Sequence, residues 1–251
     1  MKSSCSSRIV RGGICVRRLA AGFVFCLLLF PQVSDAQAID QLWLEYSPSY
    51  SLASEYKLGM RGSYRTNLED PRWRSIEVRL MPEKKLNSHF DLLGSLQFLH
   101  TRQYQALTST EIRPSIGARW HFLPGKRVTS GLRALVEFRN VYKIEAEEWT
   151  RTLRPRLRFF ASVPLNEKSM SADRVFYATS FVEFFFQNEE DIQERFSNRF
   201  WFRLGLGYKL NKKLKFELLF NRQDSKNTIN DNFEDLTKEN IILFAVRHKL
   251  N

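Results

Sequence analysis

The feature that most constrains this chain is an alternation of apolar and polar side chains with a period of two residues. In segment 56–65, apolar or small residues take the even positions, and basic or polar residues take most of the odd positions. The alternation recurs in segments 111–122, 153–163 and 199–210. Successive side chains of a strand point to opposite faces, so each segment predicts a strand with one apolar and one polar face. The sequence therefore predicts an all-β fold.

Eleven segments show this pattern. They lie near residues 41–47, 55–66, 73–81, 88–100, 108–122, 128–141, 149–163, 174–187, 196–210, 213–223 and 239–250. Eleven strands would leave the two termini at opposite ends of a barrel, whereas bacterial transmembrane barrels have an even number of strands. Segment 41–47 is the weakest, because Pro48 interrupts it. We therefore expect an up-and-down antiparallel transmembrane β-barrel of about ten strands, with twelve as the alternative.

The connections between these segments alternate in kind. Short basic or Pro/Gly turns are expected at 82–85, 124–126 and 211–213, and longer acidic loops at 144–148, 187–195 and 224–238. Short turns at one end and long loops at the other are typical of a barrel that crosses the outer membrane.

The first 36 residues have the features of an export signal. Five basic residues precede an unbroken apolar run of twelve, Leu19 to Phe30, and small residues at Ser34 and Ala36 suit a signal peptidase. The run is shorter than the roughly 20 residues of a membrane-spanning helix. We expect 1–36 to be a cleaved secretory signal peptide and 37–251 a single β-barrel domain, with an uncleaved inner-membrane anchor as the alternative.

Composition limits which ligands and partners the mature chain can have. All three cysteines lie in the first 36 residues, so the mature chain has no thiol for a disulfide or a metal site. Of the 39 Lys+Arg and 27 Asp+Glu, five and one lie there, which leaves a mature net charge of +8. In an exported protein we do not expect nucleic acid as the partner of this charge. The expected partners are outer-membrane lipids, lipopolysaccharide and the barrel assembly machinery; the oligomeric state is left open.

A lipid-embedded barrel and a soluble periplasmic barrel both fit the alternation. Three features favour the membrane: strands of 12 residues or more, aromatic side chains near strand ends, and a dense set of arginines on the polar face. The aromatic girdle is expected to contain Tyr56, Tyr64, Trp120, Tyr142, Trp149 and Tyr208. The expected location is the outer membrane of a Gram-negative bacterium.

Arginines and glutamates on the polar face predict an ion-paired lumen, because buried charges need partners. The expected members are Glu111, Arg113, Arg119, Glu137, Arg139, Arg154, Arg156, Arg158, Glu183, Arg199 and Arg203. In this register Leu153, Leu157 and Phe159 face lipid.

Several short motifs resemble a known family. They include Glu111 to Pro114 (EIRP), Arg151 to Phe159 (RTLRPRLRF), Gly205 to Leu210 (GLGYKL) and Asn221 to Gln223 (NRQ). In order and spacing they resemble domain of unknown function 2490, from about Trp43 to the C-terminus. The resemblance implies an outer-membrane β-barrel and no particular activity. The chain departs from many such barrels in lacking a C-terminal aromatic residue.

Three functions fit this reading. The first is a structural or binding barrel with an Arg/Glu-lined lumen, and the second is a small-anion channel, since charged rings select ions by sign. The third, from a different class, is a lipid or ester hydrolase that uses His100 as base and Ser109 as nucleophile at the rim. We expect no enzymatic activity, no cofactor and no metal site.

Overall fold

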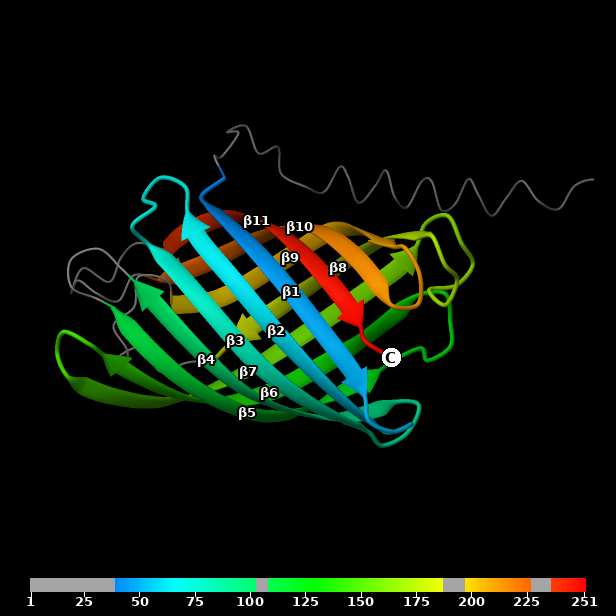
Figure 1. The fold of residues 1–251 in the computed structure, drawn as a ribbon, viewed down its shortest axis with the longest axis horizontal. Coiled ribbons are helices and arrows are strands. Elements are labelled where there is room, and N and C mark those ends of the chain that lie inside the picture. The colour runs from blue at the N-terminus through cyan, green and yellow to red at the C-terminus, as the bar shows by residue number, and fades with distance from the viewer. Residues whose placement is uncertain (1–38, 103–107, 187–196, 227–235) are drawn as a thin grey trace, which may run out of the picture. The chain divides into compact units, whose positions relative to one another are not determined.

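The computed structural model describes residues 39–102, 108–186, 197–226 and 236–251. In this part of the chain, eleven strands form a closed barrel (Figure 1). The strands are β1 (Gln41–Ser51), β2 (Tyr56–Asn67), β3 (Arg74–Lys85), β4 (Phe90–Arg102), β5 (Ser109–His121), β6 (Thr129–Lys143), β7 (Glu148–Pro164), β8 (Val175–Phe185), β9 (Ser197–Lys209), β10 (Leu214–Lys226) and β11 (Leu236–Lys249). Among the described residues, no helix is long and apolar enough to cross a membrane.

The all-β barrel is confirmed, but the expected count of ten strands, with twelve as the alternative, is wrong. Consecutive strands pair antiparallel, whereas β1 closes the barrel by pairing in parallel with β11, from Gln41 beside Ile241 to Ser49 beside Lys249. Because the number is odd, the start of β1 and the end of β11 lie at opposite ends of the barrel (Figure 1).

Pro48 does not remove β1 from the barrel. The register with β2 runs to Tyr46 opposite Gly62 and resumes at Ser49 opposite Gly59, so the proline interrupts the ladder only locally. Proline lacks one backbone donor, which is a small loss for a strand that is hydrogen-bonded on both sides. Without β1, strands β2 and β11 would each present an unpaired edge, and closure removes both edges.

Asparagine side chains place two of the turns. Asn87 accepts hydrogen bonds from the backbone N–H groups of His89 and Phe90 at 2.8 and 2.9 Å, so the turn falls at 86–89 rather than at the expected 82–85, which lies in β3. Asn211 binds the N–H groups of Lys213 and Leu214 in the same way, at the expected place. Such side-chain bonds replace the missing ladder partners at a turn.

The two faces of the barrel wall differ in kind. Large apolar side chains are exposed on the outside, as at Ile116 with 64% exposure, whereas carboxylates are buried inside, as at Glu183 with 0%. Inward residues have odd numbers in every described strand except β7, where they have even numbers. A soluble barrel would show the opposite arrangement, with its apolar face inside.

Candidate functional site

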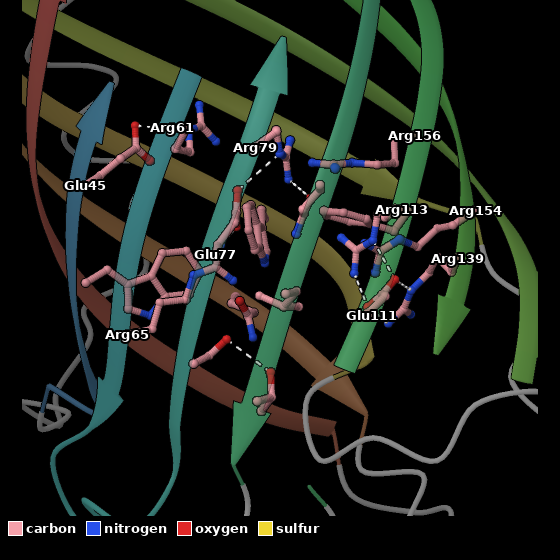
Figure 2. Close-up of a pocket in the computed structure, with 18 of the residues that line it drawn as sticks. Glu45, Arg61, Arg65, Glu77, Arg79, Glu111, Arg113, Arg139, Arg154 and Arg156 are labelled. Carbon is pink, nitrogen blue, oxygen red and sulfur yellow. Dashed lines mark hydrogen bonds and ion pairs between the residues drawn. The ribbon is translucent and has the colours of Figure 1, made fainter. Parts of the chain in front are cut away.

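The interior of the barrel holds a cavity of about 170 Å³. Its lining includes three glutamates, Glu45, Glu77 and Glu111, and a much larger set of arginines (Figure 2). The eleven arginines are Arg61, Arg65, Arg79, Arg113, Arg133, Arg139, Arg154, Arg156, Arg158, Arg203 and Arg247. The cavity is therefore a positively charged space enclosed by the barrel wall.

Glu111 on β5 anchors one group of these arginines. Arg113 donates to it through Nε at 2.7 Å and Nη2 at 2.6 Å, and Arg139 on β6 donates through the same two atoms at 2.8 and 3.0 Å (Figure 2). Two guanidinium groups thus bind one carboxylate in bidentate geometry, which is the strongest form of this pair.

Glu137 and Glu183 organise the arginines of β7. Arg154 lies 2.8 Å from Glu137, and Arg156 bonds Glu137 as well as Glu183, the latter at 2.7 Å. The Glu183 carboxylate also accepts from Arg158 at 2.6 Å and from Arg133 of β6 at 2.8 Å. These contacts arise because Glu137 is the register partner of Arg154, and Glu183 is that of Arg158.

Sequence reasoning missed a second set of lumen charges, on β1 to β3 and near the closure. Glu77 pairs with Arg65 and, at 3.1 Å, with Arg79. Glu45 lies 3.3 Å from Arg61 and 2.7 Å from Arg247, which also binds Glu217 at 3.0 Å. The signal was present, because these residues occupy the odd positions that face inward in the same strands. Arg61 and Arg65 lie in segment 56–65, whose alternation is clear, so the same rule that places Arg113 and Arg139 in the lumen places them there too.

Three of the expected lumen residues stand apart. Arg119 binds Glu83 and Asp91 at 3.1 and 3.0 Å in a separate cluster that does not line the cavity, and His121 donates from Nε2 to Asp91 at 2.8 Å. Arg203 lines the cavity but bonds the neutral Asn221. The side chain of Arg199 lies outside the described residues.

Part of the lumen wall is apolar. Leu219, Ile241, Leu243 and Ala245 of β10 and β11 form a buried cluster with Trp43 of β1. Trp201 packs against the cluster, with its ring centre 5.6 Å from that of Trp43. The inner face of β10 and β11 is thus mixed: this cluster, which we term the apolar wall, lies on the same two strands as the ion pair between Arg247 and Glu217.

The expected girdle residues all project outward near strand ends. Tyr56, Trp120 and Tyr208 lie at the end with the turns 52–55, 122–128 and 210–213, and Tyr64, Tyr142 and Trp149 lie toward the other end. Several pack on neighbouring aromatic rings. The distance between ring centres is 5.1 Å for Tyr142 and Trp149, 5.0 Å for Trp120 and Phe122, and 4.6 Å for Tyr208 and Phe176. The outer surface therefore carries aromatic side chains toward both ends.

The structure does not bring His100 and Ser109 together as a catalytic pair. Thr110 is the register partner of His100 and contacts His100 Nδ1 at 3.1 Å on the outer face. Ser109 is one residue away and lines the cavity instead. The two side chains point to opposite faces of the wall, because neighbours on a strand alternate.

The connection 165–174 is tied to the lumen at the turn end of the barrel. Lys209 Nζ, on the inner face of β9, donates to the backbone carbonyls of Met170, Ser171 and Ala172 at 3.0, 2.9 and 2.8 Å. Three carbonyl acceptors satisfy all three ammonium donors. This connection therefore covers part of that mouth.

These features define a closed β-barrel with an apolar exterior and a buried Arg/Glu network. Residues 40–234 match the family model described as Protein of unknown function (DUF2490), and the chain belongs to this family. The resemblance seen in the sequence is thereby confirmed. Among solved structures, the chain is similar to the NanC porin in a rhombohedral crystal form, with 12% identity, a TM-score of 0.48, and coverage of 85% of this chain and 100% of that one. No curated protein matches the chain in sequence.

Proposed function

We propose that the chain is an integral barrel of the bacterial outer membrane. The observation that carries this proposal is the inverted wall, with apolar side chains exposed outside and carboxylates buried inside. In water such an apolar exterior would cause aggregation, whereas a barrel that crosses a bilayer must present an apolar exterior to the lipid. The aromatic side chains toward both ends suit the two lipid–water interfaces.

Envelope fractionation followed by carbonate extraction tests this location. The mature chain is expected in the carbonate-resistant outer-membrane fraction. Recovery in the soluble periplasmic fraction would overturn the proposal and favour a soluble barrel. Outer-membrane lipids, lipopolysaccharide and the barrel assembly machinery are the partners that the proposal implies.

Within the membrane we propose a structural or binding role without catalysis. Each main lumen carboxylate binds two or three guanidinium groups, and long side chains of this kind fill much of a narrow barrel. The separation of His100 from Ser109 supports a non-enzymatic role. Lipid or ester turnover by pure refolded protein would contradict it.

Passage of small anions is a second candidate, favoured by the excess of arginine around the cavity. Rings of positive charge favour anions over cations. Conductance in planar bilayers under a salt gradient tests this candidate. We expect a reversal potential whose sign shows that anions permeate better than cations. Cation preference or the absence of conductance would eliminate it without affecting the location.

A further inference from the structure

Among the described residues, the arginines around the cavity outnumber the buried carboxylates of the lumen. Ten of the eleven cavity arginines form ion pairs in the described part of the chain, and six glutamates supply all the carboxylates for them. The six are Glu45, Glu77, Glu111, Glu137, Glu183 and Glu217. A buried charge without a counter-charge is costly, so this excess creates a demand for anions from solution.

The excess is concentrated in four arginines, Arg61, Arg133, Arg158 and Arg203, which we term the arginine belt. They come from β2, β6, β7 and β9, and all four line the cavity. Within the described part of the chain, two glutamates form ion pairs with them. Glu45 is shared between Arg61 and Arg247, and Glu183 serves Arg156 as well as two members of the belt.

Three members of the belt are also more exposed than most of the other cavity arginines, although Arg65 and Arg247 are open to a similar degree. The side chains of Arg61, Arg133 and Arg158 keep 25, 19 and 18% of their surface open, whereas Arg139 and Arg154 keep 2 and 3%. In addition, the buried Nε atoms of Arg61, Arg133 and Arg158 have no hydrogen-bond partner within the described part of the chain, a feature that they share with Arg79 and Arg156. Arg139 and Arg154 are thus sealed against their glutamates, whereas Arg61, Arg133 and Arg158 keep part of their guanidinium surface open to the cavity.

Phe181 holds two members of the belt in place. The guanidinium carbon of Arg158 lies 3.8 Å from the centre of its ring and that of Arg203 lies 4.6 Å from it. Stacking fixes the planes of both groups and leaves their N–H edges as donors. An incoming anion would therefore meet donors that are already oriented, which lowers the entropy lost on binding.

We propose that the arginine belt binds a small polyvalent oxyanion, a molecule with two or more carboxylate or phosphate groups. Planar guanidinium forks match such groups in bidentate geometry, whereas a chloride ion lacks the pair of oxygens that a fork binds and carries a single charge. A cavity of about 170 Å³ admits a small molecule rather than a polymer. The site extends the binding role proposed above and does not require that anions pass through the barrel.

Intrinsic tryptophan fluorescence and calorimetry of the refolded mature chain in detergent test this site. Trp43, Trp73 and Trp201 line the cavity, whereas Trp120 and Trp149 are exposed on the outside. The probes are citrate, pyrophosphate and chloride at constant ionic strength. Saturable binding of citrate or pyrophosphate, at least about tenfold tighter than chloride, is expected because charge-assisted bonds add up over several forks.

Arg203→Gln and Arg61→Gln test the belt itself, because neither change leaves a carboxylate without a guanidinium partner. Each is expected to weaken binding of the polyvalent anion by about tenfold. Arg151→Gln is the matched control, since Arg151 is on the exposed face of β7 and does not line the cavity; it should leave affinity unchanged. Circular dichroism and gel mobility without heating verify that each variant is folded.

Three results would overturn the site: no saturable binding, binding no tighter than that of chloride, or an equal loss in Arg151→Gln. Because these titrations use protein in detergent, their outcome is separate from fractionation and conductance. Binding without conductance would retain the site and eliminate the channel. Conductance without saturable binding would eliminate the site and retain the channel.

Discussion

The two walls of the lumen are stabilised by different physics. On β5 to β8, which we term the charged wall, Glu111, Glu137 and Glu183 each bind two or more arginines. The contribution of each glutamate to stability depends on whether its arginine partners are in place. On β10 and β11, Leu219, Ile241 and Leu243 pack without directional bonds. The charged wall discriminates strictly between registers, because a slip leaves buried charges unpaired, while the apolar wall mainly requires volume.

Within the charged wall, we expect the loss of a glutamate and the loss of an arginine to differ in their effect on stability. Carboxylates are scarce there and guanidinium groups abundant, so loss of a glutamate strands several arginines while loss of an arginine leaves each carboxylate paired. Four substitutions measure this asymmetry and the difference between the walls. Three of them are measured by urea unfolding of the refolded barrel in lipid or detergent, under conditions chosen so that unfolding is reversible, and Leu157→Arg is measured by its assembly.

Glu183→Gln should have the largest effect. It removes the charge that Arg133, Arg156 and Arg158 share, and breaking a buried pair costs about 3–5 kcal/mol. The free energy of unfolding is expected to fall by that amount, and folding yield to fall with it. A loss below about 1 kcal/mol would show that the wall is hydrated and that its ion pairs contribute little.

Leu157→Arg tests the outer face of the same strand. Leu157 lies between Arg156 and Arg158 and faces outward, so in the proposed outer-membrane location an arginine there would enter hydrocarbon at a cost of about 2–4 kcal/mol near the midplane. Assembly is expected to be severely impaired. Single cysteines at 156, 157, 158 and 159 check the orientation: a lipid-soluble label should react at 157 and 159 only, and the opposite pattern would place the charged face outside.

Leu243→Ala tests the apolar wall. The truncated side chain leaves a void in the cluster beside Trp43, and we expect a loss of about 2–3 kcal/mol with the register unchanged. Leu243→Met, which conserves volume, is the control and should cost less than about 1.5 kcal/mol. Suppose that Leu243→Ala and Leu243→Met both lowered the free energy of unfolding as much as Glu183→Gln does. The apolar wall would then be as sensitive to the exact side chain as the charged wall, and the distinction between them would be wrong.

Arg156→Leu should have the smallest effect, about 1 kcal/mol or less, although Arg156 contacts two glutamates. Glu137 keeps Arg154, and Glu183 keeps Arg133 and Arg158, so no carboxylate is left alone. The comparison with Glu183→Gln in the same experiment is decisive. If Arg156→Leu and Glu183→Gln lowered the free energy of unfolding equally, the idea that carboxylates limit ion pairing in this wall would be wrong.

The faces of the strands were predictable from the sequence because alternation is a local property. Leu153, Leu157 and Phe159 face outward and Arg154 and Arg156 inward, as a strand requires whatever its neighbours are. The odd positions of β2 and β3 follow the same rule, which is why Arg61, Glu77 and Arg79 could have been found. Local backbone geometry alone determines which side of the wall a residue occupies.

The number of strands and the choice of partners were decided by the tertiary structure. Whether Glu137 meets Arg154 depends on the register between β6 and β7, and this is the pair of strands at which the inward positions change from odd to even. The pairing of β1 with β11 joins residues about 200 positions apart and forms only when the barrel closes. The register between β4 and β5 places Thr110, and not Ser109, beside His100, and closure of the barrel brings the arginine belt together from four strands. These contacts depend on how shifts between neighbouring strands accumulate around the barrel, and no local pattern in the sequence records that accumulation.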